Sequence, residues 1–159
     1  MSDTWTQLLQ KPPADLVLIH ELGLPNDPAS IYGAEILAAR QDGSLTLQWK
    51  RAQESGALSA RVDPKIVRRW AELLATGGFP DFPPRQIAPG ASFRIFEAQA
   101  GTQRVRAVLS RFHFEDQPPY EELCAIADSV CAQMRGRKCW ADPDPARGLV
   151  RDVKPLDAP

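Results

Sequence analysis

The dipeptide Asp42-Gly43 constrains the fold of this chain more than any other feature, because β-prone segments stand on both sides of it. An Asp-Gly pair supplies the positive backbone φ that a tight hairpin turn requires. The flanking segments are residues 32–40 and 44–51, and in the second of them apolar and polar residues alternate. Such alternation is typical of a strand with one buried and one solvated face. The sequence therefore predicts an antiparallel hairpin whose one face is covered.

The clearest helix begins at Asp63-Pro64. Asp is a strong N-cap residue, and Pro suits the first position of a helix. Apolar residues then recur at helical spacing while charged residues face away, and the pattern stops at Gly77-Gly78. This segment is predicted to cover one face of the sheet.

The remaining elements follow from similar patterns. A short helical turn is expected within residues 1–10. Further strands are expected at 15–22, 57–62, 92–98 and 103–114, and a second main helix ends at Gly136. The resulting order is β-β-β-β-α, a proline-rich loop, then β-β-α. We therefore predict an α+β fold with an antiparallel sheet of about six strands and two main helices packed on one face.

The chain of 159 residues is long enough for one domain with a sizeable core. We expect residues 1–138 to form a single α+β domain. Residues 139–159 are rich in Pro and Asp and show no periodicity, so they are predicted to be an extended or disordered tail.

The charge balance speaks against a general nucleic-acid binder. The chain has 19 basic and 20 acidic residues, whereas binding to phosphates requires an excess of positive charge. The strongest basic cluster is Arg135, Arg137 and Lys138, which Arg104 and Arg106 on a neighbouring strand could extend. Cations at a helix C-terminus are also favoured by the helix dipole. Nucleic acid is therefore an unlikely partner.

Other classes are also disfavoured. No apolar run approaches the ~18 residues of a membrane span, so no membrane association is expected. The three cysteines show no disulfide or zinc spacing, which together with the missing signal segment predicts a cytoplasmic protein.

Known catalytic signatures are missing from the sequence. There is no phosphate-binding glycine loop, no Gly-x-Ser-x-Gly and no His-Glu-x-x-His. We therefore predict no catalytic residue, no metal site and no cofactor, and expect a non-enzymatic protein. The alternative is a small-molecule or enzymatic pocket around Arg111, His113 and Cys139, where the basic residues before Cys139 could lower the pKa of its thiol.

Two segments have the character of interaction surfaces. The loop from Phe79 to Pro89 places aromatic and apolar residues among prolines, which makes a stiff projection that loses little entropy on binding. The alternative is that its apolar residues pack into the core or over the sheet edge. The tail adds a further aromatic residue. The predicted partner-binding residues are Phe79, Phe82, Ile87 and Trp140.

From Tyr32 to Met134 the chain resembles emfourin-like proteins, which are small bacterial inhibitors of thermolysin-like metallopeptidases. The resemblance lies in VDPKIVRRWAELLATGGFPDFP (62–83), in PGASFRIFEAQAGTQRVRAVLS (89–110) and in the closing helix from Tyr120. It implies a protein-binding role, identifies no target and matches no inhibitory residue. We accordingly expect a protein-binding module of the inhibitor, immunity-protein or secretion-chaperone type. It would be a monomer or homodimer, acting through a sheet edge and the 79–89 loop.

Overall fold

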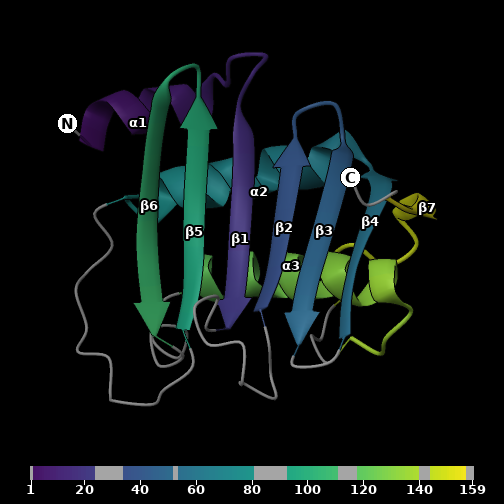
Figure 1. Ribbon diagram of the computed structural model, residues 1–159. Coiled ribbons are helices and arrows are strands. Elements are labelled where there is room, and N and C mark those ends of the chain that lie inside the picture. Colours follow the sequence, from purple (N-terminus) through teal and green to yellow (C-terminus); the bar gives the residue numbers. More distant parts are fainter. Residues whose placement is uncertain are drawn as a thin grey trace.

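The computed structural model describes residues 2–23, 34–51, 54–80, 93–110, 118–139 and 144–156. These residues form one antiparallel sheet with the strand order β6-β5-β1-β2-β3-β4-β7, together with three helices (Figure 1). The strands are β1 (Val17–Gly23), β2 (Ala34–Arg40), β3 (Ser44–Arg51), β4 (Glu54–Val62), β5 (Phe93–Ala100), β6 (Gln103–Ser110) and β7 (Val150–Pro155). The helices are α1 (Ser2–Gln10), α2 (Pro64–Thr76) and α3 (Pro118–Arg135). The α+β class predicted from the sequence is confirmed.

The hairpin around Asp42-Gly43 is confirmed by the pairing of β2 with β3. Gly43 has a φ of 89°, the left-handed conformation that favours glycine. Its carbonyl accepts a hydrogen bond from the Val62 amide at 2.8 Å, and a Cβ atom at Gly43 would lie 2.2 Å from the Val62 carbonyl oxygen. The turn is thus pressed against the end of β4, which only glycine permits.

The predicted helix after Asp63 is also confirmed as α2. The Asp63 carboxylate accepts a hydrogen bond from the Lys65 amide at 3.0 Å, which satisfies one of the unpaired amides at the helix start. At the other end, the Gly77 amide donates to the Leu73 carbonyl at 2.9 Å, and Gly78 has a φ of 83°. Local sequence chemistry therefore determines both ends of this helix.

The sheet has seven strands, not about six, because part of the expected tail belongs to it. Val150 pairs with Val62 of β4, and the pairing continues to Pro155 opposite Leu58. The segment is extended, as one of the two alternatives proposed, yet it forms β7 at the sheet edge. Five of its six residues are exposed, so no apolar alternation marks the strand in the sequence. At the N-terminus, the single helical turn expected within residues 1–10 is a nine-residue helix.

The connection into β7 is anchored on Ser129 of α3, whose side chain is fully buried. The Ser129 hydroxyl donates to the Asp144 carboxylate. It accepts from the Ala146 amide at 3.0 Å and from the Gln133 side-chain amide at 3.2 Å. A buried hydroxyl with one donated and two accepted hydrogen bonds is fully satisfied. This contact ties the segment before β7 to the body of the protein.

The sheet has two unlike faces. In Figure 1, α2 and α3 lie behind the sheet, and no described helix lies in front of it. Along β2, Glu35, Leu37 and Ala39 are buried while the residues between them are half-buried. We call the side of Glu35, Leu37 and Ala39 the covered face and the opposite side the open face.

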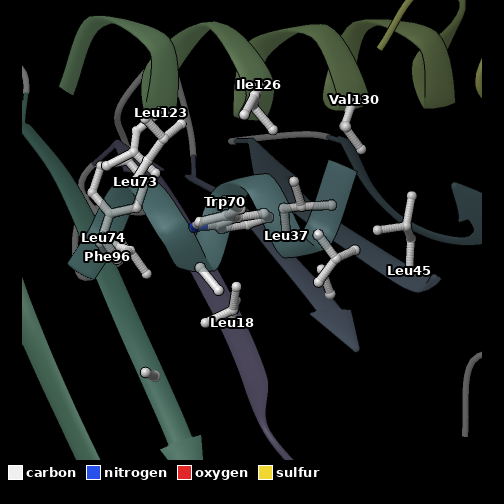
Figure 2. Packing of buried hydrophobic residues seen from close by; sticks show 14 of the residues in the cluster. Leu18, Leu37, Leu45, Trp70, Leu73, Leu74, Phe96, Leu123, Ile126 and Val130 are labelled. Carbon is white, nitrogen blue, oxygen red and sulfur yellow. The ribbon is translucent and has the colours of Figure 1, made fainter. Parts of the chain in front are cut away.

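The core lies between the covered face and the helices. Figure 2 shows Trp70 of α2 over Leu18 and Leu37 of the sheet, while Ile126 and Val130 of α3 point toward the same layer. Trp70 is 2% exposed, and Leu18 and Leu37 are fully buried. Burial of such side chains stabilises the fold by roughly 1.5–3 kcal/mol each. This packing places both main helices on the covered face, whereas Ile95 and Glu97 of β5 are buried on the open face without a described helix over them.

Candidate functional site

Of the four predicted partner-binding residues, the structure describes Phe79. Its side chain is fully buried in the core cluster, and its amide donates to the Leu74 carbonyl at 3.0 Å. Phe79 therefore follows the core-packing alternative and offers no exposed surface to a partner. Phe82, Ile87 and Trp140 lie outside the described residues.

The alternative pocket around Arg111, His113 and Cys139 is not assembled from described residues, because Arg111 and His113 lie outside them. Cys139 is half-buried, four residues after the end of α3. Within the described ranges, no group of three or more metal-ligating side chains comes together. A cavity of about 150 Å³ opens between α1 and α2, lined by residues such as Leu9 and Val67. It is small beside the ~300–1,000 Å³ of ordinary ligand pockets.

Two of the three basic residues at the end of α3 pair with acidic residues of the sheet. Arg135 donates to the buried carboxylate of Glu35 at 2.6 Å, and Arg137 lies 3.1 Å from the same carboxylate. The Arg135 guanidinium also stacks over the Trp49 ring at 4.3 Å from its centroid. Arg106 is the cross-strand neighbour of Glu97, and Arg104 is that of Gln99, so both arginines lie on the open face. The expected extension of the cluster by Arg104 and Arg106 is therefore wrong. These cations therefore do not form one patch.

A second, partly buried polar group lies between the sheet and α3. Arg94 of β5 donates two hydrogen bonds to the Asp128 carboxylate, at 2.7 and 2.9 Å, and its Nη1 atom lies 3.3 Å from Nε2 of His20. Arginine can only donate, so Nε2 of His20 is the acceptor and its proton resides on Nδ1. The His20 ring also packs on Phe96, with the ring centroids 5.1 Å apart. His20 is the satisfied histidine that its apolar surroundings suggest.

The chemistry available to this buried group is limited. Burial, and after it the charge of Arg94, lowers the pKa of His20 well below 6.5, so the ring is neutral at pH 7. Burial raises the pKa of the nearby Cys124 thiol to about 12 and also raises that of Cys131. Nucleophilic cysteines need a lowered pKa and access to solvent. The group therefore has the properties of a structural network.

The two edges of the sheet differ in how they are protected. An edge strand presents unpaired backbone groups, and proteins protect such edges with bulges, prolines and charged side chains. β7 has a register shift in its pairing with β4, a residue with positive φ at Asp152, and Pro155 at its end. It also exposes Arg151 and Lys154. β7 therefore combines several of the devices that protect a sheet edge.

The opposite edge, β6, is regular. It pairs with β5 over eight consecutive positions, from Gln103 to Ser110, without a register shift and without proline. Among the described residues, no backbone hydrogen bond reaches its outer side. Val108 is 44% exposed, the highest value among the large apolar side chains of the described ranges. Arg104 and Arg106 are its only charged residues. We call β6, with its unpaired outer side, the β6 edge.

The sequence gives little sign of which strands lie at the edges. Both β6 and β5 read as ordinary strands joined by a tight turn, and strand order is a property of long-range pairing. The local pattern before Val108 is a run of alternating Arg and Val residues, and it does not show that Val108 is exposed at a sheet edge. The one proline and the charged residues of 150–155 indicate a protected edge only once that segment is known to be a strand.

Comparisons with known proteins do not assign a family. No protein-family model matches the chain, and no curated protein matches it. The resemblance to emfourin-like proteins therefore stays a prediction. In the described part of the chain, no helix has both the length and the apolar character that a bilayer crossing requires.

Proposed function

We propose that the chain is a non-enzymatic protein-binding module that binds a strand of another protein along the β6 edge. The observation that carries the proposal is the contrast between the two edges of one sheet. β7 combines a bulge and a proline, whereas β6 is eight residues long, regular and without proline, and both strands expose two basic side chains. A long regular edge is a template for an added strand.

The groups around the β6 edge suit such a partner. Val108 supplies an exposed apolar contact at one end of the strand, and Arg104 and Arg106 supply positive charge toward the other end. The main-chain groups on the outer side of β6 would give affinity, and these side chains would select the partner. The emfourin-like resemblance supports the same class of function, a blocking or escorting protein. We further propose that the protein acts in the cytoplasm.

The test places on β6 the kind of residue that protects natural edges. V108K adds a lysine to the β6 edge, and V153K makes the same substitution on β7, where the valine is 41% exposed. Tagged wild type and both variants are used for affinity capture from the native lysate, with bound proteins quantified by mass spectrometry. Matching unfolding midpoints show that the variants are folded.

We expect a protein captured in stoichiometric amounts by wild type and V153K and depleted by about tenfold or more with V108K, the loss of roughly 1.4 kcal/mol of binding. Equal capture by V108K, or no captured protein above the tag-only control, would contradict the proposal. A wild-type homodimer that V108K splits in sedimentation would instead assign the edge to a second copy of this chain.

A further inference from the structure

The open face of the sheet is strongly basic, although the whole chain has a net charge of −1. Seven basic residues lie on it by register, and two acidic residues, Glu21 and Glu97, share it. The basic residues are Arg40, Lys50, Arg61, Arg104, Arg106, Arg151 and Lys154. The side of the sheet that no described helix covers thus carries more basic than acidic residues.

Four of these residues form a row across one end of the sheet, which we call the arginine row. Arg104 pairs with Gln99, Gln99 with Val17, and Val17 with Arg40. Since Ala39 pairs with Leu45, the next residues toward the turn are Arg40 and Ser44. Ser44 pairs with Arg61, and Arg61 with Arg151. The arginine row is Arg104, Arg40, Arg61 and Arg151.

Two members of the row stand directly opposite each other. Arg61 and Arg151 are cross-strand partners, so their Cβ atoms lie about 5 Å apart on the same face. Like charges at this position destabilise a sheet. Among the described residues, neither guanidinium is in a salt bridge, and both side chains are exposed. An anion between the two would turn this repulsion into attraction.

Acidic groups also lie near the row, among them the exposed Asp152, which follows Arg151 directly in β7. The Asp42 carboxylate accepts a hydrogen bond from the Ser44 amide at 2.9 Å, and this bond, ahead of the charges of Arg61 and Arg40, lowers its pKa. The Asp15 carboxylate accepts from the Gly101 amide at 2.7 Å. Arg104 is the one member of the row with a carboxylate partner, Glu97, at 2.6 Å. Amide hydrogen bonds leave the Asp42 and Asp15 carboxylates ionised, so the net positive charge of the row is smaller than its four arginines alone would give.

We propose that the open face docks an acidic segment of the partner protein, with carboxylates over the arginine row and apolar side chains over the centre of the sheet. This inference rests on the proposed protein-binding function. The centre of the face offers the half-buried apolar residues Ile19 of β1, Ile36 and Ala38 of β2, and Ala57 of β4, with the polar side chains of β3 between β2 and β4. An apolar centre with a charged rim is the composition of a protein interface.

The same pattern fits nucleic acid less well. Proteins that bind single strands on a sheet stack the bases on aromatic side chains. Every open-face residue whose side chain is described is aliphatic, polar or charged. Phosphates would meet the arginine row, but the apolar centre would then have no complementary group. An acidic polypeptide satisfies both regions at once.

The experiment measures binding of a labelled synthetic peptide with one Glu-rich and one Leu-rich side by fluorescence anisotropy. A peptide with Lys in place of Glu and a labelled DNA duplex are the comparison probes. R61E/R151E removes the centre of the proposed contact, and R61Q/R151Q removes the charges without reversing them. The matched control K65E/R68E changes the net charge as much as R61E/R151E does, on exposed residues of α2.

We expect saturable binding of the Glu peptide, no binding of the Lys peptide, and about tenfold or more weaker binding by R61E/R151E, with a smaller loss in R61Q/R151Q. K65E/R68E should change the affinity by less than about twofold. Equal losses in both charge-reversal variants, or no saturable binding of the Glu peptide, would overturn the inference. Tighter binding of the DNA duplex with the same dependence on Arg61 and Arg151 would assign the face to phosphates instead.

The outcome separates this inference from the proposed function. V108K-dependent capture of a protein, without binding of the Glu peptide, would leave the β6 edge standing and overturn the open-face contact alone. Binding of the Glu peptide by wild type, with no protein captured from the lysate, would overturn the proposed edge function while the open face keeps its preference for acidic segments.

Discussion

The two faces of the sheet are built from the same strands, yet they treat charged side chains in opposite ways. On the covered face two arginines meet carboxylates: Arg94 meets Asp128 at 2.7 Å, and Arg135 meets Glu35 at 2.6 Å. On the open face Arg104 likewise pairs with the buried Glu97, but the exposed Arg61 and Arg151 lie opposite each other. The difference follows from the solvent, because a buried charge must be paired whereas an exposed charge is stabilised by water.

This difference shows which charged side chains are constrained by folding and which are available for binding. The charges of the covered face are satisfied from within the chain, so their pattern needs no partner to explain it. Apart from the buried Glu97 and its partner Arg104, the exposed charges of the open face contribute little to stability and can be arranged for contact with another molecule. Removing a charge should therefore affect stability on one face and binding on the other.

The largest effect is expected for Arg135, which is nearly buried beside the buried carboxylate of Glu35. R135M should lower the free energy of unfolding by about 3 kcal/mol, because it leaves Glu35 with a weaker partner in Arg137. Urea denaturation followed by circular dichroism measures the loss. The double variant E35L/R135M should recover most of it, since an apolar pair of similar volume replaces the ion pair. Equal losses in the single and double variants would contradict this account.

A smaller, pH-dependent effect is expected for His20. Its pKa is near 6.5 in the unfolded chain and well below that value in the folded protein, so protonation favours unfolding. The stability that the neutral ring contributes is present above pH 6.5. It is lost as the pH falls, at about 1.4 kcal/mol per pH unit, until the folded-state pKa is reached. H20Q should abolish this slope between pH 6.5 and 5.5 in urea titrations. A slope unchanged in H20Q would show that His20 does not cause it.

The smallest effect is expected on the open face. R151E places a carboxylate opposite Arg61 and should raise the free energy of unfolding by about 0.5 kcal/mol, because an attractive cross-strand pair replaces a repulsive one. High salt should reduce the gain. K154E introduces the same charge opposite Ser59 and should give a smaller gain. If K154E stabilises the protein as much as R151E does, the effect arises from net charge and the pairing with Arg61 is irrelevant.

Local signals in the sequence were sufficient for most of the fold. Asp42-Gly43 predicts the central hairpin, and Asp63 and Gly77 predict the ends of α2, because turn and cap residues act within a few positions of themselves. β7 could not be predicted in the same way. Its exposed residues carry no alternation, and its place in the sheet depends on a contact between Ser129 and residues 144–146.

The candidate site was predicted less well. Phe79 was expected to contact a partner, yet aromatic residues after a helix serve equally well to close a core, and the sequence does not distinguish the two roles. The arginine row could not be predicted from the sequence, because its members come from four different strands. Only the registers of the sheet bring them together.

The position of β7 has a consequence for how the protein is made. During synthesis β7 leaves the ribosome after the other described strands. Until residues 150–155 emerge, β4 is therefore the edge strand on this side of the sheet. Domains commonly begin to fold while synthesis continues, and unpaired strand margins are the points at which nascent chains aggregate. The interval between completing α3 and docking Ala146 on Ser129 is therefore a vulnerable stage of biogenesis. A fast-docking last strand would shorten that stage.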